Sequence, residues 1–278
     1  GCHEDRLDAV APRRTLQALV RAPSQLENWY GEPRLFSYLE EVQPVFDANC
    51  IMCHDVDKPG AKSICLAGDQ NLIFNCSYFE LRKDRRFVNV PGAGPHRTML
   101  PRSWGSYASR LAEVALEGHG DPARDIFLDL TQEDKDRIVT WIDINAPYYP
   151  RYASAYRNNL YGRSPLNNAQ LDALIRITGV DLKKQNNGNQ LYFGRPEKSP
   201  ALAALEAGSA DYAEALAIID AGRVLLAERP RADSADFVLT DPTEIAAEEK
   251  YQQMLADERA RLQAIAEGER LYNSLEEE

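Results

Sequence analysis

One pentapeptide constrains this chain more than any other feature: Cys50-Ile51-Met52-Cys53-His54. Two thiols separated by two residues, with a histidine directly after the second, form the attachment signature of c-type haem. The spacing suits the chemistry, because two thiols that add to the two vinyl groups of one porphyrin must lie on one turn. The adjacent imidazole then binds the iron from one side of the ring. The pentapeptide therefore predicts haem c held by Cys50, Cys53 and His54.

Two other kinds of site use a similar spacing. A thioredoxin-type redox pair lies between a strand and a helix, and no strand pattern precedes Cys50. A zinc site needs further ligands, and no second C-x-x-C or H-x-x-x-H follows the motif. We therefore favour covalent haem over both alternatives.

The chain begins with Gly1-Cys2-His3, which repeats the end of the same motif. If these residues close another C-x-x-C-H, its first cysteine precedes Gly1, and Cys2 and His3 belong to a first haem. The chain is then expected to be a fragment of a larger multihaem protein. The alternative is that Cys2 is a lipoprotein junction, a disulfide partner or a free thiol. Lipoprotein processing, however, would remove Gly1.

The composition sets broad limits on function. The chain has 278 residues, of which 44% are hydrophobic and 27% charged, as in one or two globular domains. Its net charge of −11 argues against nucleic acid or an anionic membrane surface as a partner. We find neither a membrane-spanning apolar run nor a signal peptide. Because bacteria attach c-type haem outside the cytoplasm, we expect a periplasmic or extracellular protein whose signal was removed or lies upstream.

The two remaining cysteines, Cys65 and Cys76, flank a Gly-Asp turn. Such a turn can bring the ends of the segment together, and an oxidising compartment favours disulfides. We therefore predict a disulfide between Cys65 and Cys76, with two half-buried free thiols as the alternative.

The predicted fold is mainly α: a cytochrome c-like haem domain followed by a helical C-terminal extension. Residues 1–34 are punctuated by proline and glycine and are interpreted as a linker that carries the end of an upstream haem motif. From Leu35 to Phe46 apolar residues recur at helical spacing and lead into Cys50. We place the haem domain at 35–150 and the extension at 151–278.

Capping signals predict further helices in both parts of the chain. The expected helices are 107–117 after Ser106, 132–145 after Thr131, 168–177 capped by Asn168 and closed by Gly179, a short helix from Ser199-Pro200, 210–229 after Ser209, and a long one from Asp241 nearly to Glu278. The last is rich in Glu and Arg, which predicts a solvated helix. A coil that binds a partner or a second copy is the alternative.

Three residues are candidates for the sixth position of the iron. His119 lies between two glycines at a predicted helix end, where little side chain obstructs a porphyrin. Met99 lies in a loop before Pro101, and a loop methionine can be an axial ligand. His96 follows Pro95 in the same loop. His/His ligation would leave no vacant position on the iron, whereas His/Met ligation would raise its potential.

Several stretches together resemble the cytochrome domain of hydrazine synthase alpha-subunit-like proteins. These are RLFSYLEEVQPVFDANCIMCH, LPRSWGSYASRL, LEGHG, LTQEDKDRIVTWIDINAPYY and NNLYGRSPLNNAQL, and the resemblance extends from residue 1 to about 165. In that family a β-propeller precedes a C-x-G-C-H haem motif, and a linker and a second haem domain follow. The resemblance implies that GCHEDR ends the first motif and that the second haem has two histidine ligands, which maps the distal ligand to His119.

One departure bears on activity. In the hydrazine-forming enzyme a tyrosine shortly after the first motif binds the iron, whereas Glu4, Asp5, Arg6 and Leu7 follow His3 here. The resemblance therefore supports the fold and the second haem more than the reaction.

Three functions from different classes are compatible with these features. The first is electron transfer to or from a redox partner protein or an upstream haem or propeller domain. The second is a haem enzyme that acts on a small nitrogen or oxygen compound at the first haem. The third is a structural or polymerising cytochrome module. We favour electron transfer, and no phosphate-binding loop, dinucleotide fingerprint or nucleophile elbow suggests other chemistry.

Overall fold

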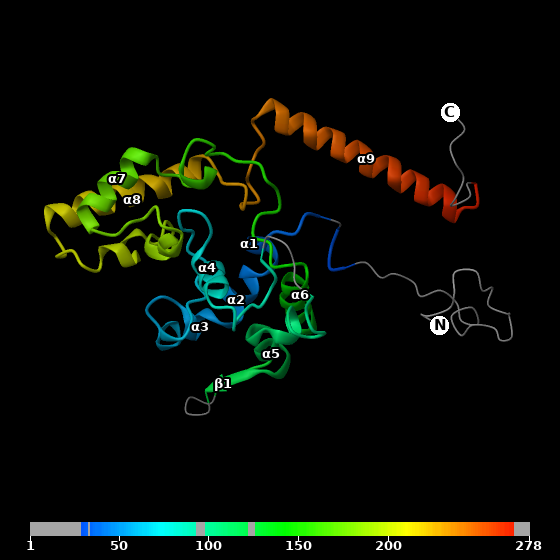
Figure 1. Ribbon diagram of the computed structural model, residues 1–278, viewed down its shortest axis with the longest axis horizontal. Helices are drawn as coiled ribbons and strands as arrows, with labels where there is room; N and C mark the ends of the chain where they lie inside the picture. The colour runs from blue at the N-terminus through cyan, green and yellow to red at the C-terminus, as the bar shows by residue number, and fades with distance from the viewer. Residues whose placement is uncertain (1–28, 33, 93–97, 122–125, 270–278) are drawn as a thin grey trace. The chain divides into compact units, whose positions relative to one another are not determined.

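The computed structural model describes residues 29–32, 34–92, 98–121 and 126–269 (Figure 1). The first 34 residues form one unit and residues 35–278 another. The α-helices are α1 Tyr38–Glu41, α2 Gln43–Asn49, α3 Ile51–His54, α4 Cys76–Lys83, α5 Arg110–Glu117, α6 Gln132–Asp143, α7 Asn168–Thr178, α8 Ala210–Glu228 and α9 Pro242–Ala266. The 3-10 helices are η2 Pro59–Lys62, η3 Ser106–Ala108, η5 Leu160–Gly162, η6 Gln185–Gln190, η7 Pro196–Lys198 and η8 Pro200–Leu202.

The prediction of a mainly α fold is confirmed, with one small sheet in the part of the chain that the structure describes. Strands β1 (His119–Asp121) and β2 (Ile126–Leu128) pair antiparallel, with His119 opposite Leu128. This hairpin follows α5 directly and was not predicted. Over the described residues, no helix combines the length and the apolar character needed to cross a membrane.

A first hydrophobic core joins α1, α2, α4, α5 and α6. Tyr38, Phe46 and Trp141 are completely buried in it, and the ring centres of Tyr38 and Trp141 lie 5.1 Å apart. The Trp141 Nε1–H donates a hydrogen bond to the Pro147 carbonyl at 2.9 Å, so the buried indole is satisfied. Burial of such large rings drives this part of the fold.

A second core is built by α7, α8 and the irregular segment between them, with Leu171, Phe193 and Ile219 buried at its centre. The loop of residues 71–74 links the two cores, because Leu72 is buried in the second core and Phe74 packs on the first. The predicted boundary between residues 150 and 151 stays a prediction.

Three of the six helix starts that were predicted from caps are confirmed by the side chains that cap them. Thr131 Oγ1 accepts from the Asp134 N–H, Ser209 Oγ from the Tyr212 N–H, and Asp241 Oδ1 from the N–H groups of Thr243 and Glu244. These bonds satisfy donors that the first turn of a helix leaves free.

Three predicted boundaries are wrong. α5 begins at Arg110 instead of Tyr107, because Ser106 opens only a 3-10 turn and bonds to Asp143. α7 is capped by Asn167 instead of Asn168, since Asn167 and Gln170 form a reciprocal capping box. The long helix α9 ends at Ala266, earlier than predicted, and Gly268 follows with a φ of 77°; residues 270–278 lie outside the described residues. No side chain of α9 is buried, as predicted for a solvated helix.

The buried tyrosines predict a loss of stability at alkaline pH. Burial raises the pKa values of Tyr38 and Tyr148 well above their ordinary value. In the unfolded chain these phenols ionise near pH 10, so above that pH only the unfolded state loses their protons. Each such tyrosine should lower the free energy of unfolding by about 1.4 kcal/mol per pH unit above about pH 10.

Urea unfolding, followed by circular dichroism from about pH 8 to about pH 11, measures this slope. Tyr38→Phe should make the fall less steep, while the matched control Tyr152→Phe should leave it unchanged because Tyr152 is 99% exposed. Equal slopes in both variants would contradict the assignment to buried phenols.

Candidate haem site

The two motif cysteines lie on one turn at the junction of α2 and α3. The Cys50 N–H donates to the Phe46 carbonyl at 2.8 Å, and the His54 N–H donates to the Cys50 carbonyl at 2.9 Å. Cys50 thus closes α2 and opens α3, and Cys53 follows three residues later on the same face. Both thiols are half-buried and free, as two attachment points for one ligand require.

The Cys50 thiol is neutral at pH 7. Burial, and then the nearby Asp134 and Asp47 carboxylates, raise its pKa to about 12. A metal-binding cysteine is a thiolate, favoured by positive surroundings. Across the described residues no three His, Cys, Asp or Glu side chains converge on a common metal position. A porphyrin supplies four nitrogens to its iron, so two protein ligands suffice there.

The His54 imidazole is held in a defined orientation. Its Nδ1 lies 3.0 Å from the Ile64 carbonyl oxygen, which can only accept a hydrogen bond, so Nδ1 carries the proton. The lone pair is then on Nε2, at the other end of the ring. Such a bond from the second nitrogen is the usual support of a metal-binding histidine.

Gly60 makes this support possible. A Cβ at Gly60 would lie 2.5 Å from the Cys53 carbonyl oxygen and 2.9 Å from His54 Nδ1. The short helix η2 can therefore pack against the histidine only with glycine there. The Leu66 N–H also donates to the His54 carbonyl at 2.8 Å, which fixes the segment after η2 along α3.

His119 is brought to the site by the turn between α5 and β1. Gly118 ends α5 with a φ of 85°, and a Cβ there would lie 2.6 Å from the Phe127 ring and 2.9 Å from the Leu128 carbonyl oxygen. Glycine is thus required both by the backbone conformation and by the space. His119 follows as the first residue of β1 and is exposed.

The structure places His119 close to His54. Their ring centres are 6.1 Å apart, and the ring planes are inclined at 47°. An imidazole nitrogen lies about 2.0–2.1 Å from a bound metal and about 1.1 Å from its own ring centre, so two imidazoles on opposite sides of one iron have centres about 6.2–6.4 Å apart. The observed separation therefore fits the two axial ligands of one haem.

Exposed apolar side chains lie on α3, on α5 just before His119, and on the strand paired with β1. Met52 of α3 is 63% exposed, Leu116 of α5 54% and Phe127 of β2 72%. Large exposed apolar side chains on neighbouring elements indicate a surface that a ligand covers. A porphyrin needs such a wall, so these residues fit the same group as the histidines.

The helical extension holds the loop that follows His54. The Arg195 guanidinium pairs with both oxygens of Asp55, the residue after His54, and also with Asp69. The Arg195 guanidinium lowers the pKa of Asp55. Sequence reasoning missed this contact, because 140 residues separate the partners and no local pattern joins them.

The predicted disulfide between Cys65 and Cys76 is not formed in this structure, although the expected proximity is present. Both residues are buried free thiols that hydrogen bond to each other, in a cluster with Tyr192. Cys76 Sγ also lies 3.5 Å from Tyr192 Oη and from Asn189 Nδ2. The hydrogen bond from Cys76 lowers the pKa of Cys65, while this bond and burial raise that of Cys76. The alternative of free thiols describes the pair here.

Of the other candidate ligands, the structure describes Met99 alone. Met99 is described and is 40% exposed in its loop. Cys2, His3 and His96 lie outside the described residues. The structure thus supplies geometry for the pair His54 and His119, and the roles of all these residues as haem ligands stay predictions.

Comparison with known proteins adds one relative. The chain is 27% identical over 142 residues to hydrazine synthase subunit alpha of Kuenenia stuttgartiensis. The match covers 43% of this chain and 17% of that subunit. The relationship is a distant one. The chain spans about a sixth of the length of this curated relative. No protein-family profile matches the chain, and no solved structure matches it.

Proposed function

We propose that this chain is a c-type cytochrome module that transfers electrons through a haem attached at Cys50 and Cys53. The observation that carries the proposal is the pair of imidazoles, His54 and His119, with ring centres 6.1 Å apart. A haem bound there would supply a one-electron Fe(III)/Fe(II) couple. The distant similarity to a hydrazine synthase subunit supports a haem-related role.

The residues around the pair favour electron transfer over catalysis at this position. The His54 imidazole is held by the Ile64 carbonyl, and the backbone of His119 is held by the pairing of β1 with β2. Two histidine ligands leave no vacant position for a substrate. Met52, Leu116 and Phe127 would exclude water from the ring edge.

The proposed setting is a larger multihaem protein outside the cytoplasm, where haem is attached to C-x-x-C-H motifs. Its electron partner would be an upstream haem or propeller domain, or a separate redox protein. We include in this proposal a first haem at Cys2 and His3. The exposed helix α9 is the proposed surface for any association with a second copy or a partner.

Haem attachment is tested on the full chain, exported to a compartment with haem-attachment enzymes. The wild-type chain should show a c-type pyridine haemochrome spectrum. The double variant Cys50→Ser/Cys53→Ser should lose the mass of one covalently bound haem, because both thioether bonds are removed. Intact mass spectrometry measures this loss directly.

The matched control is Cys65→Ser/Cys76→Ser, which changes two cysteines that lie outside the motif. It should keep the haem mass of the wild type. If the two double variants carried the same haem mass, Cys50 and Cys53 would not be the attachment site.

A second candidate function is suggested by the name of the relative. A haem enzyme acting on a small nitrogen compound would need an iron with a vacant position, which the His54 and His119 pair does not offer. The reaction would then occur at the first haem. In a chain extended upstream of Gly1, carbon monoxide binding to one of two haems would favour the enzyme, and binding to neither would favour the electron carrier.

A further inference from the structure

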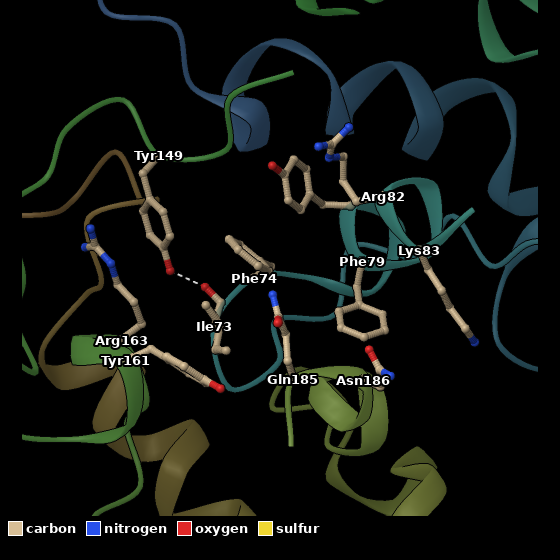
Figure 2. Close-up of a pocket in the computed structure, with 11 residues that line it drawn as sticks. Ile73, Phe74, Phe79, Arg82, Lys83, Tyr149, Tyr161, Arg163, Gln185 and Asn186 are labelled. Carbon is tan, nitrogen blue, oxygen red and sulfur yellow. Dashed lines mark hydrogen bonds between the residues drawn. The ribbon is translucent and has the colours of Figure 1, made fainter. Parts of the chain in front are cut away.

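A pocket with no assigned role lies beside the loop that joins the two cores. Its volume is about 790 Å³, within the range of small-molecule sites in proteins. Its walls come from Ile73 and Phe74 of the linking loop, from α4, and from the segments around Tyr161 and Gln185 (Figure 2). None of the haem-site residues described above lines it.

Aromatic rings form much of the wall. Phe74 and Tyr149 have ring centres 6.1 Å apart, and the Tyr149 hydroxyl donates to the Ile73 carbonyl, so this side is fixed. Phe79 is packed on Gly188 so closely that a Cβ there would lie 2.8 Å from the ring. The rings therefore keep their places without a ligand, as a preformed site requires.

The charge of the pocket is opposite to that of the chain. Arg82, Lys83 and Arg163 line it, and no carboxylate is found among its described lining residues. The whole chain carries 43 acidic and 32 basic residues. Figure 2 shows Arg163 and Lys83 at opposite ends of the pocket, with Phe74 between them.

Arg163 is positioned by neighbours that do not neutralise its charge. Its guanidinium carbon lies 3.9 Å from the centre of the Tyr149 ring, and its nitrogens donate to the carbonyls of Ala153 and Tyr152. A guanidinium held on a ring face is a good receptor for an acidic group.

Tyr161 adds an independent observation. It has a φ of 52° and a ψ of 16°, in the left-handed region that costs a non-glycine residue about 1–2 kcal/mol. Its ring is nevertheless 57% exposed and has one long hydrogen bond, from its hydroxyl to the Lys183 carbonyl at 3.5 Å. Strained residues that the packing does not explain concentrate at ligand sites.

From these features we propose that the pocket binds a small aromatic anion, a flat ring system that carries an acidic group. The rings of Phe74, Phe79 and Tyr161 would contact its faces, and the cations at the two ends would receive its charge. This site is separate from the proposed haem site, so either proposal can fail without the other.

Isothermal titration calorimetry on the haem-loaded full chain tests the proposal, with naphthalene-2-sulfonate as the probe. For a ligand of this size we expect saturable one-to-one binding with a Kd on the order of 10–100 µM. The neutral ring 2-naphthol should bind at least about tenfold more weakly, because it lacks the charge. No saturable heat with the sulfonate, or equal binding of the two probes, would overturn the proposal.

Three variants locate the binding. Lys83→Glu should weaken sulfonate binding about tenfold, whereas the matched charge reversal Lys250→Glu on exposed α9 should leave it unchanged. Tyr161→Gly should also weaken binding, yet keep the circular dichroism spectrum, because glycine accepts a φ of 52° without strain. If Lys83→Glu and Lys250→Glu had the same effect, or if Tyr161→Gly bound the probe as tightly as the wild type, the pocket would not be the site.

Discussion

Replacing His119 with alanine should convert the proposed haem from a state that excludes carbon monoxide to one that binds it. The wild-type iron is expected to have both axial positions filled by His54 and His119, whose rings face each other at 6.1 Å. Alanine removes one ligand, so the ferrous variant should bind about one carbon monoxide per haem while the wild type binds almost none. Absorption spectra of the reduced protein, with and without the gas, measure the change.

The same position should set the reduction potential. His119→Met would replace an imidazole with a thioether, which stabilises the reduced iron. We expect the midpoint potential to rise by on the order of 0.1 V, a modest part of the roughly 0.8 V that axial ligands span. His119 is exposed at the start of a strand, so its replacement should leave the fold intact.

Met99→Ala is the matched control, because Met99 is the other described candidate for the distal position. It should leave both carbon monoxide binding and the potential unchanged. Carbon monoxide binding by Met99→Ala but not by His119→Ala would assign the ligand to the methionine and would overturn the His/His pair.

The sequence pointed to the candidate site through signals that are local. The C-x-x-C-H spacing requires only five consecutive residues, and the turn at His119 depends on Gly118, whose φ of 85° explains the glycine. The caps at Thr131, Ser209 and Asp241 are equally local, since each is completed within three residues.

The errors arose where two local signals competed. Ser106 and Ser109 are both acceptable at a helix start, and the structure begins α5 after Ser109 because Ser106 is bonded to Asp143, 37 residues away. Asn167 and Asn168 are adjacent, and only the first is three residues before Gln170. The hairpin of β1 and β2 has strands of three residues, too short for a period of two to be recognised.

Contacts between distant segments could not be predicted at all. Helix α4 was missed because buried Ser77 dilutes its apolar pattern, and that hydroxyl is satisfied by Gln43 and Tyr38 from the other end of the domain. The pairing of Arg195 with Asp55 likewise depends on the packing of the extension against the haem motif. Such pairs are set by tertiary structure, for which a single sequence contains no direct signal.

The second large effect is expected from Arg231, whose side chain is buried next to the loop that links the two cores. Its guanidinium donates to the Asp233 carboxylate and to the carbonyls of Asn71 and Phe74. Asp233 in turn accepts from the Tyr148 hydroxyl at 2.9 Å. This cluster therefore fixes the linking loop and the end of the first core to the extension.

Arg231→Met should lower the free energy of unfolding by about 3–5 kcal/mol, because it leaves the Asp233 charge buried without its cation and removes the donor to the Asn71 carbonyl. Thermal and urea unfolding, followed by circular dichroism, measure the loss. The double variant Arg231→Met/Asp233→Leu should recover part of it, since the unpaired charge is gone while the Asn71 carbonyl still lacks the donor that Arg231 supplied.

Arg223→Met on α8 is the matched control. Arg223 pairs with Asp220 on the surface, where both side chains are about half exposed, and exposed ion pairs contribute little to stability. We expect no measurable change for this variant. Equal destabilisation by Arg223→Met and Arg231→Met, or a double variant less stable than Arg231→Met, would show that the buried pair does not hold the linking loop in place.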